Sequence, residues 1–137
     1  MEIEPNNVLA WYNKGNALSL SSKHDDAIRC YDKALEIEPN RADTWIGKGH
    51  ALNGLGKHEE AIQCYDKALE IEPNKANAWY NKGVSLYFLG KHNEAIQCFD
   101  KALEIDPNND LYNRNRNLVL AKMGKTKKSG WKRFFAR

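Results

Sequence analysis

One nine-residue phrase recurs along the chain at a fixed interval of 34 residues. Asp-Lys-Ala-Leu-Glu-Ile-Glu-Pro-Asn occupies residues 32–40 and residues 66–74, and it returns at residues 100–108 with one Glu replaced by Asp. A period of this length means that each unit is a small element that cannot bury its own apolar face, so the core forms between stacked neighbours. The sequence therefore predicts an extended array, whose usual role is recognition rather than chemistry.

Length and charge set further limits. The 137 residues allow one short array and leave no room for a second domain. Six of the 21 basic residues lie after Gly124 in a stretch without any acid, so the remaining 15 face 18 acidic residues. The net charge of +3 thus divides into a body near −3 and a tail of +6.

The three cysteines, Cys30, Cys64 and Cys98, occupy equivalent places in successive units. Equivalent helices of neighbouring repeats lie roughly 8 to 10 Å apart or more, beyond the roughly 7 Å between Cα atoms that a disulfide can bridge. We therefore expect free, half-buried thiols. Free thiols, with no signal peptide and no long apolar run, indicate the reducing cytoplasm.

Each unit has the pattern of two helices followed by a stop. The first helix is predicted from about residue 7 to residue 20, with Trp11 and Gly15 on its apolar stripe. The second begins near residue 24 and ends before Pro39, because proline lacks the amide proton and disfavours helix at the preceding residue. We expect Gly15 to meet Ala27 of the second helix, and Tyr31 to pack between one hairpin and the next.

Small, aromatic and proline positions recur together in all three units. In the first unit they are Trp11, Gly15, Leu18, Ala27, Tyr31, Ala34 and Pro39. Their spacing, identity and threefold recurrence resemble the tetratricopeptide repeat. The resemblance implies an all-α, right-handed superhelical solenoid of antiparallel helix hairpins, with units at residues 8–41, 42–75 and 76–109. Lys14, Lys48 and Lys82 stand where the family often has Leu, which indicates a more solvated position.

Both ends of the chain depart from the full repeat. Residues 1–7 reproduce the close of a preceding unit, and residues 110–124 have the pattern of a capping helix from a degenerate fourth unit. Residues 125–137 form a basic, aromatic tail. The leading fragment is consistent with a segment of a longer array, and equally with an initiator Met followed by a shortened repeat.

No catalytic or metal-binding motif is present in the sequence. His24, His58 and His92 recur once per unit, and this spacing prevents them from converging on one ion at about 2.1 Å. There is no Cys-x-x-Cys pair, no paired-His helix motif and no phosphate-binding glycine loop, and nothing resembles a nucleophile with its base. We therefore expect a protein that is not an enzyme, with no cofactor, no metal and no small-molecule substrate.

Rotation about the first helices predicts a binding surface. In the resembled family these helices line a concave groove, and the face opposite the apolar stripe is found at 100° per residue. The candidate peptide-binding groove comprises Tyr12, Asn13, Asn16, Asp43, His50, Asn77, Tyr80, Asn81, Phe88, Arg114, Asn115 and Lys122.

Three of these groove residues, Asn13, Asn81 and Asn115, occupy equivalent places in their units. A side-chain amide can donate to a peptide carbonyl and accept from its amide, which suits an extended backbone. A similar asparagine row binds extended peptides in some relatives. The alternative is that these are ordinary solvated polar residues.

A second use of the family is a clamp for a C-terminal carboxylate, built from lysines or arginines of more than one first helix. The basic places of that clamp hold Tyr12, Asn77 and Asn81 here, so the resemblance disfavours it. A carboxylate could meet Arg114 or Lys122 only at one end of the groove.

The tail interleaves basic and aromatic residues. They are Lys125, Lys127, Lys128, Trp131, Lys132, Arg133, Phe134, Phe135 and Arg137. On a helix the three aromatic residues share one face. Three interpretations stay open: a degraded second helix that docks on the end of the solenoid, contact with nucleic acid or an anionic membrane, and self-association through the open end of a neighbouring molecule.

The sequence therefore predicts a non-catalytic protein–protein interaction scaffold that binds a protein or extended peptide in its concave groove. The alternatives are a basic-tailed adaptor for nucleic acid or an anionic surface, and a self-assembling repeat module.

Overall fold

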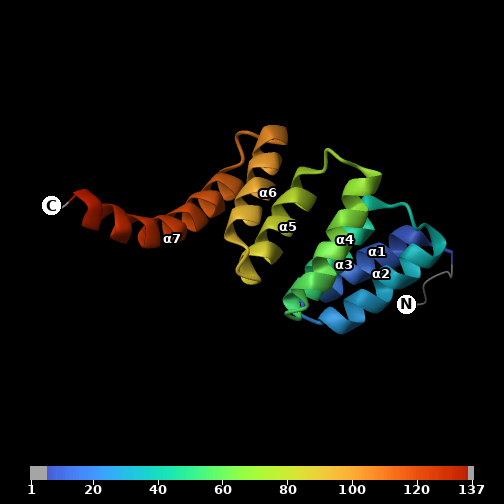
Figure 1. Ribbon diagram of the computed structural model, residues 1–137. Helices are drawn as coiled ribbons and strands as arrows, with labels where there is room; N and C mark the ends of the chain where they lie inside the picture. The colour runs from blue at the N-terminus through green and yellow to red at the C-terminus, as the bar shows by residue number, and fades with distance from the viewer. Residues whose placement is uncertain (1–5, 136–137) are drawn as a thin grey trace.

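Three helical hairpins stacked in sequence order make up most of the molecule (Figure 1). The structure is a computed structural model that describes the backbone of residues 6–135 and the side chains of residues 6–124. The helices of this part are α1 (Val8–Leu20), α2 (His24–Ile37), α3 (Ala42–Gly54), α4 (His58–Ile71), α5 (Ala76–Phe88), α6 (His92–Ile105) and α7 (Asp110–Phe135), and it contains no strand. The predicted all-α repeat fold is confirmed.

The helix boundaries follow from a few residues in each unit. Each second helix starts at its histidine and stops two residues before its proline, as the sequence indicates. Each first helix ends in a turn in which the next lysine donates back into the helix, as from Lys57 N to Leu52 O at 2.9 Å. That turn needs one residue in the left-handed region. Gly56 and Gly90 supply it with φ of 78° and 80°, whereas Ser22 adopts it with φ of 61°.

A buried aromatic ring from each second helix lies against a glycine of its own first helix. A Cβ atom on Gly15 would lie 2.7 Å from Cε1 of Tyr31, and one on Gly49 would lie 2.6 Å from Cε1 of Tyr65. The glycine therefore makes room for the ring. The expected approach of glycine to alanine accompanies it in the third hairpin, where a Cβ atom on Gly83 would lie 3.1 Å from the backbone oxygen of Ala95.

The same ring joins neighbouring hairpins. A Cβ atom on Gly47 of α3 would lie 2.8 Å from the Tyr31 ring, which is 1% exposed. Tyr31 therefore packs between α1 and α3, as predicted. Its equivalents Tyr65 and Phe99 are buried to the same degree.

Polar contacts also connect successive units. Trp45 Nε1 donates to the carbonyl of Pro39 at 2.8 Å, which holds α3 to the turn before it. Lys48 Nζ lies 2.7 Å from Asp32 Oδ1, with the lysine side chain only 23% exposed. Lys48 therefore forms an ion pair between hairpins rather than only facing solvent. Lys82 with Asp66, and Arg116 with Asp100, repeat this pair.

Helix α7 caps the array and then continues past it. Buried Tyr112 and Val119 face the last hairpin, and Met123 packs on the same cluster. The helix does not end at Gly124, where the sequence placed the boundary between cap and tail, but extends to Phe135 and projects from the hairpins (Figure 1). The reason is that the region after Gly124 contains no proline, and each of the two glycines in this helix, Gly124 and Gly130, costs only about 1 kcal/mol.

The left-handed serine gives a first prediction. Replacing Ser22 by Gly should raise the free energy of unfolding by about 1 kcal/mol, because glycine adopts this conformation without the steric cost of a Cβ atom. Gly56→Ser is the matched control. It should lower the free energy of unfolding through the backbone conformation alone, because no atom lies within 4 Å of a Cβ atom at this position. Urea unfolding followed by circular dichroism measures the free energy of unfolding of both variants. A Ser22→Gly chain no more stable than wild type would contradict the left-handed conformation of Ser22.

The contact between ring and glycine gives a second prediction. Gly49→Ala should destabilise the chain by about 1–3 kcal/mol, because its Cβ atom would collide with the fully buried Tyr65 ring. Gly124→Ala in α7 meets no atom within 4 Å and should be neutral or stabilising by up to about 1 kcal/mol. Equal effects of the two substitutions in thermal unfolding would show that the ring is not confined by the glycine.

Candidate functional site

A polar hollow of about 410 Å³ spans the first helices of all three hairpins. Its lining residues are Tyr12, Asn16, Ser19, Leu20, Tyr31, Asp43, Ile46, Gly47, His50, Asn77 and Asn81. Six of them belong to the groove predicted from the sequence: Tyr12, Asn16, Asp43, His50, Asn77 and Asn81.

Three amide side chains are among the polar groups of this hollow. Tyr31 Oη donates to Asn16 Oδ1 at 2.6 Å, which leaves both hydrogens of the Asn16 amide nitrogen free to donate. Burial raises the pKa of Tyr31 to about 12, so its hydroxyl stays protonated at neutral pH. Among the described contacts, the side chains of Asn77 and Asn81 form no hydrogen bond within the chain.

The charge at the edge of the polar hollow is compensated. Asp43 Oδ1 lies 3.0 Å from Lys75 Nζ, and this hydrogen bond raises the pKa of Lys75. No lysine or arginine is among the lining residues. The hollow therefore offers donors and acceptors without a net positive charge.

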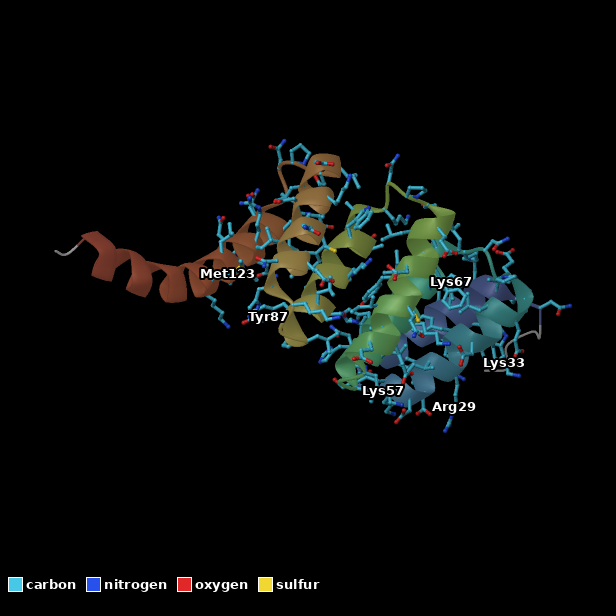
Figure 2. All side chains as sticks on the ribbon, in the orientation of Figure 1. Arg29, Lys33, Lys57, Lys67, Tyr87 and Met123 are labelled. Atoms are coloured by element: carbon cyan, nitrogen blue, oxygen red, sulfur yellow. The ribbon has the colours of Figure 1, made fainter. Side chains whose placement is uncertain are left out.

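A second, apolar hollow of about 360 Å³ lies between α5, α6 and α7. It is lined by Val84, Tyr87, Phe88, Phe99, Asn115, Leu118, Val119 and Lys122, of which Phe88, Asn115 and Lys122 were predicted groove residues. In Figure 2, Tyr87 and Met123 mark the region where α7 meets the last hairpin.

The remaining three predicted residues line neither hollow. Asn13 and Arg114 are exposed. Tyr80 stacks on Tyr112, with 4.6 Å between ring centroids, and its hydroxyl accepts a hydrogen bond from Asn115 Nδ2. The structure thus does not bring the asparagine row together: Asn81 faces the polar hollow, Asn115 faces the apolar one, and Asn13 lies outside both.

Rotation about the first helices missed several lining residues of each hollow. Tyr31 and Phe99 come from second helices, and Ser19, Tyr87 and Val119 lie beside the predicted face. One signal for Tyr31 was present in the sequence, because Gly47 stands where the other units have Asn. A glycine at that place makes room for the neighbouring ring.

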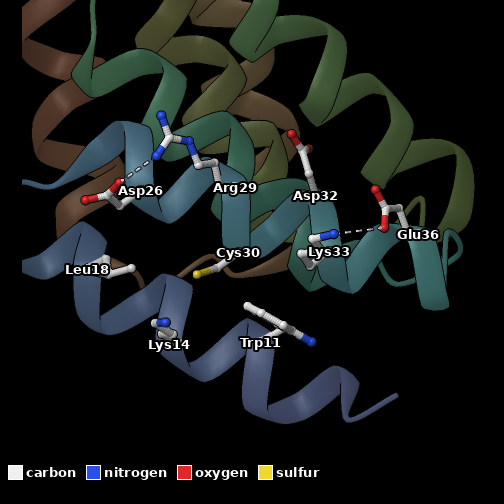
Figure 3. A pocket seen from close by; sticks show the side chains of 9 residues that line it. All are labelled: Trp11, Lys14, Leu18, Asp26, Arg29, Cys30, Asp32, Lys33 and Glu36. Atoms are coloured by element: carbon white, nitrogen blue, oxygen red, sulfur yellow. Dashed lines mark hydrogen bonds and ion pairs between the residues drawn. The ribbon is translucent and has the colours of Figure 1, made fainter. Parts of the chain in front are cut away.

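Another hollow lies within the first hairpin, between α1 and α2 (Figure 3). It has about 560 Å³, and in Figure 3 Trp11 and Lys14 of α1 face Cys30 of α2. Hollows of about 470 Å³ with equivalent linings occur in the second and third hairpins. Because each hairpin repeats it, we attribute this hollow to the packing of two helices rather than to a site.

The cysteines line these outer hollows and are free thiols. Burial raises the pKa of Cys64 and of Cys98 to about 11, against an ordinary value of 9.0, and it also raises the pKa of Cys30. In the described part of the chain, no three His, Cys, Asp or Glu side chains are arranged to hold a metal ion.

The family models match the chain throughout its three hairpins. Models described as tetratricopeptide repeat match residues 8–41 and 76–109 and residues 30–63, and one described as TPR repeat matches residues 49–90. Together they extend without a gap from residue 8 to residue 109. The chain belongs to the tetratricopeptide repeat family. No curated protein matches it in sequence.

Solved structures of the same fold are similar at low sequence identity. The NMR structure of the first TPR domain of human RPAP3 has a TM-score of 0.85 and 24% identity, over 92% of this chain and 99% of that one. The first TPR of Spaghetti (RPAP3) bound to HSP90 peptide SRMEEVD has a TM-score of 0.82 and 22% identity, over 90% and 98%. The Sgt2 TPR domain from Aspergillus fumigatus has a TM-score of 0.84 and 22% identity, over 88% of this chain and 82% of that one.

The predicted tail site lies outside the described side chains. The backbone of α7 is helical to Phe135, but the basic and aromatic side chains of residues 125–137 are not part of the description, so the three interpretations of the tail stay predictions. None of the helices in the described part is both long and apolar enough to cross a bilayer.

The buried cysteines give a third prediction. A shift of pKa from 9.0 to about 11 lowers the thiolate fraction of Cys64 and Cys98 about a hundredfold at pH 8, so both should react slowly with Ellman's reagent. The rate should rise about tenfold per pH unit up to pH 10. The same chain in urea, with ordinary thiols, is the control, and equal rates in the folded and unfolded chains would contradict the burial.

Proposed function

We propose that this chain is a non-catalytic protein-interaction module that holds an extended segment of a partner protein in its polar hollow. One observation carries the proposal: a single hollow spans α1, α3 and α5, and amide side chains from two of these helices line it. Side chains from successive hairpins meet there, so the array forms a site that no single hairpin has.

The chemistry of the hollow favours recognition of backbone. An amide side chain donates and accepts at once, as a peptide group does. Asn77 and Asn81 are about one turn apart on α5, so they are matched to peptide groups about two residues apart in an extended chain. The extended form leaves those groups unpaired and available. The protonated Tyr31 hydroxyl keeps the Asn16 oxygen occupied, which fixes Asn16 as a donor to the ligand.

A known complex of this fold with a peptide supports peptide binding, but its peptide differs in charge from what this hollow suits. The first TPR of Spaghetti (RPAP3) was solved with the HSP90 peptide SRMEEVD, and this chain covers 98% of it in the same fold. That peptide is acidic, whereas the polar hollow here has no lysine or arginine in its lining. We therefore infer a ligand read through its backbone in this hollow, with no requirement for a terminal carboxylate.

The test uses peptides selected from a random twelve-residue display library with the wild-type chain as bait. Asn81→Ala should weaken the selected peptides about tenfold, because two hydrogen bonds to one backbone group are lost. Asn117→Ala is the matched control: Asn117 is exposed on α7, outside both hollows, and its loss should change nothing. Fluorescence anisotropy measures the affinities.

Two further measurements separate the alternatives. N-methylation of a central peptide amide should cost more affinity than replacing the same residue by Ala, because the backbone is what is read. Deleting residues 125–137 should leave peptide binding intact. Peptides that bind the Asn81→Ala variant as tightly as wild type would reject the groove. RNA binding that falls steeply with salt and is lost on deletion of residues 125–137 would favour the basic-tailed adaptor instead.

A further inference from the structure

The apolar hollow lies one helical turn beyond the polar hollow along α5. Asn77 and Asn81 face the polar hollow, whereas Val84, Tyr87 and Phe88 face the apolar one. One turn corresponds to roughly 5 Å, which an extended chain spans in about two residues. A segment held in the first hollow therefore reaches the second without a bend.

The apolar hollow has a buried floor and an exposed apolar mouth. Phe99 and Val119 at its base are buried, while Phe88 is 60% and Leu118 is 56% exposed. The Phe88 ring is held in place by stacking on His58, with 5.0 Å between centroids and 13° between planes. Exposed apolar side chains that are already ordered around a cavity are typical of sites that receive a large apolar side chain.

Positive charge flanks this mouth. Arg114, Leu118 and Lys122 are spaced by four residues, so they lie along one face of α7. Lys122 lies over the Tyr87 ring at 4.8 Å and donates to its hydroxyl. Among the described ion pairs neither Arg114 nor Lys122 has an acidic partner, although the neighbouring Arg116 pairs with Asp100. The chain has no acid at all after Asp110.

We propose that the apolar hollow takes one large apolar side chain, Leu or Phe, of the segment whose backbone lies in the polar hollow, and that carboxylates beside this side chain meet Lys122 and Arg114. The inference rests on the proposed function. The expected partner segment is an internal acidic stretch. It has one apolar residue about two positions away from the peptide groups that bind in the polar hollow. A free C-terminus is not required, because the cations lie beside the side-chain hollow.

The probe is the peptide Ser-Ser-Ser-Glu-Leu-Glu-Ser-Ser-Ser, with fluorescein coupled to its N-terminal amine and an amidated C-terminus. Its symmetry allows either chain direction along α5. Two companion peptides replace its Leu by Ala, or both Glu by Gln. Binding is measured by anisotropy at low and at high salt.

The protein variants remove each contact and have matched controls. Leu118→Ala should weaken the probe about tenfold, and Lys122→Gln about threefold at low salt with a smaller effect at high salt. Leu111→Ala and Lys101→Gln are exposed equivalents outside the hollow and should bind as wild type. The peptide with Ala should lose about tenfold on wild type and nothing further on Leu118→Ala, because the two changes remove the same contact.

The outcomes distinguish this inference from the proposed function. Loss of binding with Leu118→Ala but not with Asn81→Ala supports the apolar anchor and rejects the backbone-reading hollow; the reverse rejects the anchor alone. Equal binding of the Leu and Ala peptides also overturns the inference. So does a wild-type dimer in sedimentation that Leu118→Ala converts to monomer, since a second copy would then occupy the hollow.

Discussion

An aromatic ring set against a glycine is the contact on which the rest of the array depends. Tyr31 fills the space left by Gly15 in its own hairpin and touches Gly47 of the next, so one side chain joins two hairpins. The same ring also lines part of the polar hollow, where Gly47 makes room for it. In the third unit Asn81 occupies that place. The same position thus holds a glycine that makes room for a ring in the second unit and an asparagine in the third.

The fold could be predicted from the sequence almost completely, because the signals are local. Proline stops and helical spacing determine the hairpins, and the repeat itself determines the stacking. The site was predicted only in part. Rotation about one helix found Asn16 and Asn81, but it cannot find Tyr31, which arrives from the second helix, or the engagement of Asn115 with Tyr80, which depends on how α7 docks. The continuation of α7 beyond Gly124 was missed because the repeat pattern, rather than the helix-forming residues after it, was used to place its end.

The concave face changes character along an otherwise uniform scaffold. One equivalent position is occupied in turn by Asn16, His50, Val84 and Leu118, so it passes from polar to apolar. The core positions hardly change over the same distance, because any change there would disturb the contact between ring and glycine. Variation is therefore confined to the surface that a partner meets. This is why two hollows of different chemistry lie side by side on α5.

The ion pairs between hairpins bear on how such an array can change its length. In each pair the aspartate belongs to one unit and the cation to the next, as in Asp32 with Lys48 and Asp100 with Arg116. Gain or loss of one whole unit of 34 residues would leave every internal charge with a partner. Any other insertion would separate aspartates from cations and rotate the rings away from their glycines. The molecule is thus built to tolerate duplication in complete units, and its terminal helix supplies a cation, Arg116, at the place where the preceding units have lysine.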